Sequence, residues 1–182
     1  MMITKQNATA SSFVSLNHHH SLQMDRTAAG PFVVASKTLI FQTEDAPHFI
    51  DLTSTVSMLA EHTGITDGTI LVFSKHTTAA IVVTEHEPLL LEDIAQMLGR
   101  LVPHTAHYRY RHDDMTIRTV NLMPDEPENG HAHCQHLFLG ASIQFPLVEG
   151  RLDLGQWQRI FLVELDRPRL RQVVVQVSGV RE

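Results

Sequence analysis

Apolar residues recur at helical spacing in two segments of the chain. In the first, Leu52 and Val56 begin a stripe on one helix face, and Gly64 follows where a helix C-terminus favours a residue that tolerates positive φ. In the second, Pro88 suits the first turn of a helix whose apolar stripe continues to Leu101. The spacing therefore predicts two helices.

The other apolar runs are short and lack the helical period, which is typical of strands. They cover residues 32–43, 69–74, 79–84, 137–145, 150–154, 159–165 and 170–177. The connections between the last four runs are too short for a parallel crossover, which needs a dozen or more residues. The pattern therefore predicts an α+β domain, a mostly antiparallel sandwich or partial barrel that carries the two helices.

Residues 1–30 differ from the rest of the chain. They are rich in Ser, Thr, Asn and Ala, and they include the histidine run His18, His19 and His20. They show no regular period, and they lack the charged start and apolar centre of a secretory signal. We expect a flexible N-terminal leader over residues 1–30 and one folded domain over residues 31–182.

Composition narrows the class of protein. With 182 residues and 43% hydrophobic content, the chain can bury the core of one domain. No apolar run approaches the roughly 18 residues of a membrane-spanning helix. The net charge of −6 and the pI of about 6.1 argue against a nucleic-acid partner, which requires clustered Lys and Arg. The single cysteine, Cys134, excludes an internal disulfide and favours a cytoplasmic protein.

Histidine is the unusual component, with 13 copies. His76 lies in a short polar run between two predicted strands, where an imidazole can titrate near neutral pH or bind a metal. The alternative is a hydrogen-bonded histidine that caps the end of a strand. Glu85 follows the second of these strands, so it can support a site shared with His76.

A second histidine cluster covers residues 128–136. If this segment is a strand, His131 and His133 project from one face and can share a metal. If it is a helix that starts after Gly130, His133 and His136 lie together instead. The sequence leaves both conformations open, with surface histidines as a third interpretation.

His112 and Asp113 form a third candidate pair, within the long segment 104–130. A loop of that length inside a compact domain is uncommon and often functional. A carboxylate beside a histidine can fix the tautomer of the imidazole or raise its basicity. Solvated loop charges are the alternative interpretation of this pair.

Four residues are candidates for substrate binding: Asn129, Arg151, Trp157 and Arg169. Guanidinium groups bind phosphate bidentately, and an indole can stack on a flat ring. Surface ion pairs and core packing are the commoner uses of Arg and Trp. The sequence contains no P-loop, GxGxxG, GxSxG, HExxH or CxxC pattern, so the usual nucleotide, hydrolase and zinc signatures are absent.

Taken in order, these segments resemble the YjbQ family of small proteins, which are identified as secondary thiamine-phosphate synthases. The resemblance covers nearly the whole domain, from Phe32 onward, and Gln156 is a departure because the family has a threonine before the tryptophan. The segments are HTTAA at 76–80, Glu85 before EPLLLED, YRHDD at 110–114, ENGHAH at 128–133 and LGASIQFPLVEGRLDLGQWQRIFLVELDRPR at 139–169. The last of these is the most specific.

The resemblance implies a jelly-roll-like α+β domain that forms a homotrimer, with the site near a subunit boundary. It also implies the coupling of a hydroxymethylpyrimidine pyrophosphate to a thiazole phosphate, with release of pyrophosphate. Arg151, Arg169 and a divalent ion, zinc or magnesium, would neutralise the leaving group, and Trp157 would stack on the ring. The other expected site residues are the catalytic His76, Glu85, His112 and Asp113 and the metal-binding His131 and His133.

Two classes of function stay open on the sequence. The first is a metal-assisted enzyme that acts on a phosphorylated small molecule, either by transfer or as a metal-dependent phosphohydrolase. The second is a trimeric module that binds a metal or a metabolite without turnover. The enrichment of histidine and carboxylate residues near one polar loop favours the enzyme. Covalent hydrolysis is not favoured, because the sequence gives no cue for an activated Cys134 thiolate and no Ser sits in a nucleophile elbow.

Overall fold

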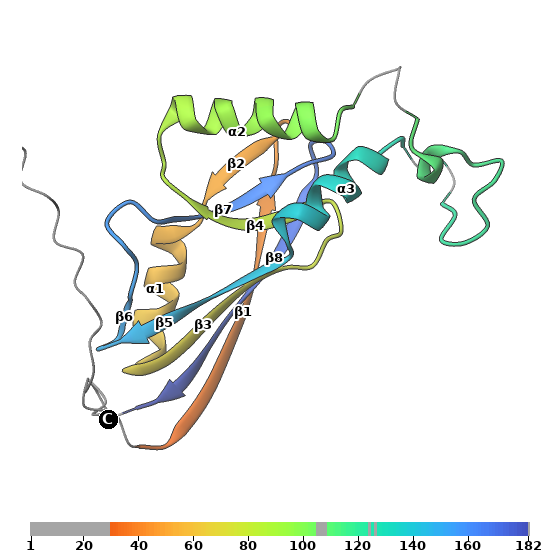
Figure 1. Cartoon of the computed structure of the whole chain (residues 1–182). Helices are drawn as coiled ribbons and strands as arrows, with labels where there is room; N and C mark the ends of the chain where they lie inside the picture. The colour runs from red at the N-terminus through yellow and green to blue at the C-terminus, as the bar shows by residue number, and fades with distance from the viewer. Residues whose placement is uncertain (1–29, 105–108, 124, 126, 182) are drawn as a thin grey trace, which may run out of the picture.

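The computed structural model describes residues 30–104, 109–123, 125 and 127–181. These residues form two sheets and three α-helices (Figure 1). The elements are β1 (Phe32–Gln42), β2 (His48–Asp51), α1 (Thr53–Thr63), β3 (Asp67–Ser74), β4 (Ala79–Thr84), α2 (Pro88–Leu101), the 3-10 helix η1 (Arg111–Asp113), α3 (Gly130–Leu139), β5 (Ser142–Val148), β6 (Arg151–Leu152), β7 (Arg159–Glu164) and β8 (Leu170–Val180). The predicted leader, residues 1–30, lies outside the described residues except for Gly30.

The larger sheet has the strand order β1-β8-β3-β5-β6, and the smaller sheet has the order β2-β7-β4. Every pairing among the described strands is antiparallel, which confirms the predicted α+β class with its antiparallel sandwich. The pairing of β1 with β8 runs from Phe32 opposite Val180 to Gln42 opposite Leu170. The central strand of the smaller sheet, β7, contributes side chains to both hydrophobic cores of the domain.

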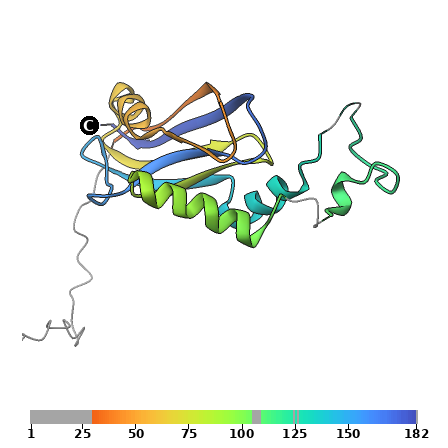
Figure 2. The same ribbon diagram turned by 90° about the horizontal axis from the view of Figure 1, so that it is seen from above.

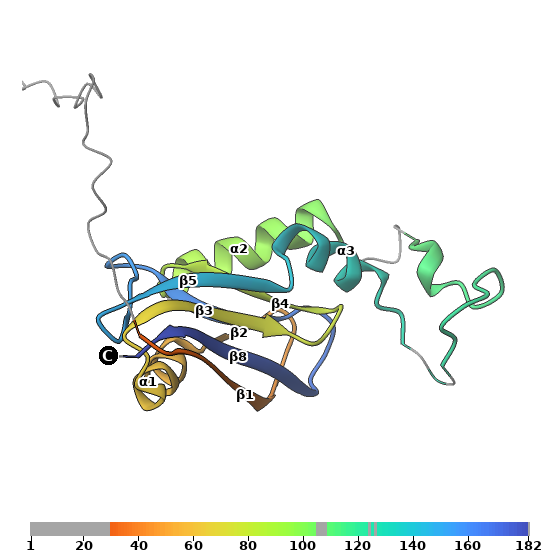
Figure 3. The ribbon, with the colours of Figure 1, turned by 90° about the horizontal axis from the view of Figure 1, so that it is seen from below.

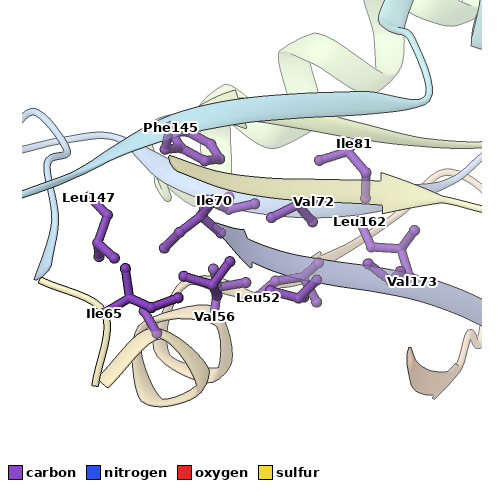
Figure 4. Packing of buried hydrophobic residues seen from close by; sticks show 14 of the residues in the cluster. Leu52, Val56, Ile65, Ile70, Val72, Ile81, Phe145, Leu147, Leu162 and Val173 are labelled. Atoms are coloured by element: carbon purple, nitrogen blue, oxygen red, sulfur yellow. The ribbon is translucent and has the colours of Figure 1, made fainter. Parts of the chain in front are cut away.

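The main core fills the space between the two sheets and is closed by α1 (Figure 4). Val56 of α1 is fully buried there together with Ile70 of β3. Side chains of β7 alternate between two cores, as the strand period requires: Leu162 points into the main core, whereas Phe161 and Val163 pack under α2 and α3. Each such side chain contributes about 1.5–3 kcal/mol by leaving water.

The two predicted helices are confirmed as α1 and α2. Gly64 follows α1 with a φ of 67°, the left-handed conformation that glycine tolerates best. At the start of α2, the carboxylate of Glu87 accepts the backbone N–H groups of Leu89 and Leu90, and Pro88 occupies the first turn. Local capping chemistry therefore sets the ends of both helices.

The third helix, α3, differs from the prediction. A strand was expected over residues 137–145, but its first residues belong to α3, and the strand β5 begins at Ser142. Leu137 and Phe138 are 82% and 70% exposed, so their apolar character does not reflect burial in a sheet. Gly140, with a φ of 89°, ends the helix and turns the chain into β5. The sequence pattern also missed the short strand β2 and placed a longer strand where β6 has two residues.

The helices divide the molecule into layers. The second core places α2 and α3 on the face of the smaller sheet that points away from the main core. Figure 2 shows α2 and α3 along one side of the molecule, with α1 on the other. The segment that contains η1 extends from the N-terminal end of α3, away from both sheets (Figure 3). Among the described residues, no helix is long and apolar enough to span a membrane.

Candidate functional site

The candidate site is built around the first turn of α3. The carboxylate of Asp113 accepts the backbone N–H groups of Asn129 at 3.0 Å and Gly130 at 2.8 Å. It therefore caps the helix, complements the positive end of the helix dipole and ties η1 to α3. A Cβ at Gly130 would lie 2.4 Å from the Cβ of Tyr110, so this contact requires glycine.

Four histidines meet in two pairs around α3. The rings of His104 and His131 are stacked with centroids 4.0 Å apart, and those of His112 and His133 meet edge to face at 4.6 Å. His131 and His133 point in directions about 200° apart, because each residue advances a helix by about 100°. His131 and His133 therefore each have their own partner from the segment that precedes the helix.

The helix resolves the two conformations that the sequence leaves open. His131 and His133 do not share a face, as they would in a strand, so they do not converge on one point. Within the described ranges, no group of three or more His, Cys, Asp or Glu side chains is placed to hold a metal ion. The pair His112 and His133 is the closest approach of two predicted site histidines that the ring contacts record.

His131 is the most buried histidine of the group, with 5% of its surface exposed. Its Nδ1 has no hydrogen-bond partner among the described residues, and neither has Oδ1 of Asn129, two residues earlier. Buried polar atoms are nearly always hydrogen-bonded, so these two atoms mark a position for water, an ion or a ligand atom. Burial lowers the pKa of His131 and His104 lowers it further, whereas Asp166, Asp113 and the backbone of Leu165 oppose the shift. The imidazole is therefore neutral at pH 7 and can act as a base or as a ligand.

Asp166 forms ion pairs with two arginines beside α3, and its side chain is 1% exposed. Arg167 donates from Nε and Nη2 to Oδ1 at 3.1 and 3.0 Å, and Arg169 pairs with Oδ2 at 2.7 Å. The amide of Asn129 also reaches Oδ2, at 3.4 Å. Both guanidinium groups are more than a third exposed, so they can still meet a ligand. We call the whole group the α3 histidine site: His104, His112, Asp113, Asn129, His131, His133, Asp166, Arg167 and Arg169.

A buried ion pair between Glu164 and Arg171 stabilises the turn that carries Asp166 of this site. The guanidinium of Arg171 bonds both carboxylate oxygens of Glu164 and the hydroxyl of Thr78. One oxygen of Glu164 also accepts the backbone N–H groups of Leu165 at 3.1 Å and Asp166 at 3.0 Å. Burial alone would raise the pKa of Glu164, but the hydrogen bonds from Arg171 and the backbone outweigh it and lower the pKa. The ionised carboxylate therefore fixes the turn that presents Asp166.

His76 lies at the same end of the molecule, on the connection between β3 and β4. Its Nε2 accepts the backbone N–H of Gln172 at 2.7 Å, so its Nδ1 carries the proton in the neutral ring. Burial lowers the pKa of His76, and the positive charge of Arg171 lowers it further. This hydrogen bond matches the strand-end interpretation of His76, while its position keeps it beside the ion pair that supports the site.

Three of the predicted site residues, Glu85, Arg151 and Trp157, lie away from the α3 histidine site in the folded chain. The strand β7 begins at Arg159 and ends at Glu164. At a rise of about 3.3 Å per residue, these two residues lie about 17 Å apart. Glu85 follows the residue of β4 that pairs with Arg159, and Trp157 precedes Arg159 by two positions, so both lie at the end away from the α3 histidine site. Arg151 pairs with Val148 at the end of β5 that is farthest from α3.

The sequence interpretation missed several residues of the site. Asp166, Arg167 and His104 stand in irregular segments, where no period indicates which side chains turn inward. Arg171 could have been found, because it lies at the start of the strand-like run RQVVVQV in phase with its buried valines. A charge at a buried strand position requires a partner, and here that partner is Glu164.

Comparison with known proteins gives a consistent assignment. The family model described as "UPF0047 protein YjbQ-like" matches residues 37–180. A UPF0047 protein of Methanothermobacter thermautotrophicus is 38% identical over 146 residues, which cover 80% of this chain and 93% of the relative. One from Archaeoglobus fulgidus is 37% identical over 137 residues, covering 75% of this chain and 96% of the relative.

Solved structures agree with this match. A YbjQ-like protein of unknown function from Sulfolobus solfataricus superposes with a TM-score of 0.72 at 36% identity, covering 82% of this chain and 99% of the other. A hypothetical protein from Aeropyrum pernix superposes with a TM-score of 0.68 at 33% identity, covering 80% of this chain and 98% of the other. The matched residues 37–180 contain the α3 histidine site and both sheets except for the first residues of β1. The chain therefore belongs to the UPF0047, or YjbQ-like, family.

Proposed function

We propose that the protein is a cytoplasmic enzyme that acts on a phosphorylated small molecule at the α3 histidine site. The observation that carries this proposal is the buried imidazole of His131, whose Nδ1 has no partner among the described residues. A buried, neutral imidazole with an open nitrogen is suited to accept a proton or to hold a ligand. A purely structural histidine would be expected to satisfy that atom within the protein.

The charges around His131 favour a phosphorylated ligand. Arg167 and Arg169 converge on Asp166, and their partly exposed guanidinium groups keep further donors for phosphate oxygens. Asp113 already accepts the backbone N–H groups of Asn129 and Gly130 at the start of α3, so we expect phosphate binding to depend on side chains rather than on these amides. The pair of His112 and His133 adds two imidazoles close to the same helix end.

The specific reaction that we propose is thiamine-phosphate synthesis. The bond between the pyrimidine methylene carbon and the pyrophosphate oxygen breaks, and its electron pair leaves with pyrophosphate. The ring nitrogen of the thiazole phosphate then forms the new bond to that carbon. The protein mainly has to neutralise the leaving group, a role for Arg167 and Arg169, while the imidazoles hold or donate protons to its oxygens.

A divalent metal, zinc or magnesium, and a homotrimer belong to the same proposal. The described side chains of one chain fit a complete metal site poorly, because they do not bring together three ligands. His112 and His133 would supply two imidazoles, and substrate oxygens or a second copy of the chain would complete the coordination. When bound, the metal would add positive charge for the pyrophosphate. In a trimer, Arg151 of one copy would approach the α3 histidine site of another.

The test is product formation from the two thiamine precursors in the presence of magnesium. We expect thiamine phosphate to accumulate with the wild type and to fall at least about tenfold with Arg169→Ala, which removes a charge-assisted contact. Arg100→Ala, an exposed arginine of α2, is the matched control and should retain the wild-type rate. Absence of product at high enzyme concentration would reject the thiamine reaction.

The second candidate is a metal-dependent phosphohydrolase, or a trimeric module that binds a metabolite without turnover. Phosphate release from a panel of phosphomonoesters, with and without zinc, separates these two. Release that depends on His133 favours hydrolysis. Saturable binding without release favours the module.

A further inference from the structure

A second cluster of charged side chains lies at the end of β7 that is away from the α3 histidine site. Asp51 ends β2, Arg159 begins β7 and His86 follows β4, so the three strands of the smaller sheet each bring one residue to this edge (Figure 1). One oxygen of Asp51 accepts hydrogen bonds from Nδ1 of His86 and from Nε of Arg159, both at 2.9 Å. The other oxygen accepts the backbone N–H of Thr53 at 2.9 Å.

The carboxylate orients the imidazole of His86. Because Nδ1 donates to Asp51, the Nε2 atom is the one left to meet a ligand, and the side chain is 52% exposed. The ring also packs edge to face against Phe161, with centroids 5.3 Å apart. Asp51 and Phe161 therefore hold the ring of His86 in place and leave Nε2 accessible, unlike the ring of a freely solvated surface histidine.

The same carboxylate orients the guanidinium of Arg159. Its Nε is used by Asp51, and within the described part of the chain its Nη atoms make no hydrogen bond. Its side chain is 43% exposed. Asp51 is firmly ionised, with a pKa lowered to about 2 because hydrogen bonds from Thr53, Arg159 and His86 outweigh the effect of burial. One carboxylate therefore holds an imidazole and a guanidinium side by side.

We propose that Asp51, His86 and Arg159 form a second anion site, which binds a phosphate group through Nε2 of His86 and the Nη atoms of Arg159. A bound phosphate would stabilise the imidazolium from one side while Asp51 stabilises it from the other. Glu85 and Glu87 flank His86 and oppose anion binding. Glu87, however, is hydrogen-bonded to the N-terminus of α2, which offsets part of its charge.

Trp157 adds a second, independent observation at this edge. It precedes Arg159 by two residues and is 63% exposed, although it is the single tryptophan of the chain. The turn that carries it is ordered, because Gln158 bonds Gly155 through both its backbone and its side chain at 2.9 and 2.8 Å. An exposed indole on a fixed turn suits a flat ring, so the ligand class is a phosphomonoester of an aromatic or heteroaromatic ring.

The inference takes from the proposed function only the class of ligand, and its test does not depend on catalysis. The histidine ring signals of the protein are followed by NMR at constant pH while inorganic phosphate and then phenyl phosphate are added, with His86→Gln used to assign the signal of His86. We expect the His86 signal to move towards the imidazolium position and to saturate. His62, an exposed histidine of α1, should not respond.

Matched variants decide the outcome. Arg159→Gln should weaken phosphate binding about tenfold, Arg159→Lys should weaken it less, and Glu85→Gln should strengthen it about twofold. His133→Ala should leave it unchanged, so failure of the thiamine reaction and failure of this site are distinguishable. Phenyl phosphate should also change the fluorescence of Trp157. A His86 signal that responds no more than that of His62, or an Arg159→Gln variant that folds and binds phosphate as the wild type does, would overturn the proposal.

Discussion

Arg171 and Glu164 form an ion pair that is almost wholly inaccessible to water, with 2% and 0% of their side chains exposed. The pair lies at the end of β7 where the chain turns towards the α3 histidine site. Glu164 also accepts backbone N–H groups from that turn. A buried pair with this many partners couples the stability of the domain to the shape of the site.

Breaking this pair from one side should be costly. Glu164→Gln leaves the Arg171 charge buried with a weaker partner, so we expect the free energy of unfolding to fall by about 3–5 kcal/mol. Urea denaturation measures it. Glu85→Gln, an exposed glutamate, is the matched control and should change stability by less than about 0.5 kcal/mol. Equal effects of the two substitutions would show that the ion pair does not have this structural role.

One buried and two partly buried histidines predict a pH dependence of stability. Burial lowers the pKa values of His76, His131 and His136 below the ordinary 6.5. Below pH 6.5 the unfolded chain therefore binds protons that the folded chain does not, so stability must fall as the pH drops through this window. Urea denaturation at pH 7.5 and pH 5.5 measures the change.

The variant His131→Asn isolates one of these contributions. It removes a titrating group while keeping a polar side chain, so its stability should fall less than that of the wild type over the same pH interval. An interval above pH 5 also avoids the loss of stability expected when Glu164 becomes protonated, which begins below its ordinary pKa of 4.5. A wild-type stability that rises on acidification to pH 5.5 would contradict the prediction.

Asp113 should matter for helix α3 rather than for the sheets. Asp113→Ala removes the acceptor for the backbone N–H groups of Asn129 and Gly130, at a cost of about 1 kcal/mol. We expect faster hydrogen exchange at the first turn of α3, with β3 and β8 unchanged. Asp114→Ala is the matched control, because Asp114 bonds Thr116 within its own segment. Exchange in α3 that is the same in both variants would argue against the cap.

The sequence predicted the strands and the first two helices well because their periods reflect simple burial. It left the conformation of α3 open between helix and strand, because His131, Ala132 and Gln135 belong to the buried face and leave no apolar stripe. Two candidate residues next to strands, His76 and Arg169, reach the region of α3, because β4, β7 and β8 bring them to the same end. Glu85, Arg151 and Trp157 also adjoin strands but lie at other strand ends, because a strand-like period does not show which end of a strand meets the site. Asp166 and His104 could not be predicted, because their partners are distant in sequence and only the folded chain brings them together.

The fluorescence of Trp157 tests whether the surface at the start of β7 is exposed to water. As the single tryptophan of the chain, 63% exposed, it should emit like a free, water-exposed indole and be quenched readily by acrylamide. Trp157→Phe gives the background. Emission typical of a buried indole, at a dilution where the protein is monomeric, would contradict the exposed position of this side chain.

The account depends most on the claim that His131 is a neutral imidazole whose Nδ1 faces a bound ligand. Nitrogen NMR of the histidine rings tests it most directly, with inorganic pyrophosphate and magnesium added at pH 6.5 and His131→Asn used for assignment. We predict that His131 is neutral at this pH and that its Nδ1 signal moves on addition of the ligand, while His62 does not respond. A His131 ring that is largely protonated at this pH, with no response to pyrophosphate, would contradict the account.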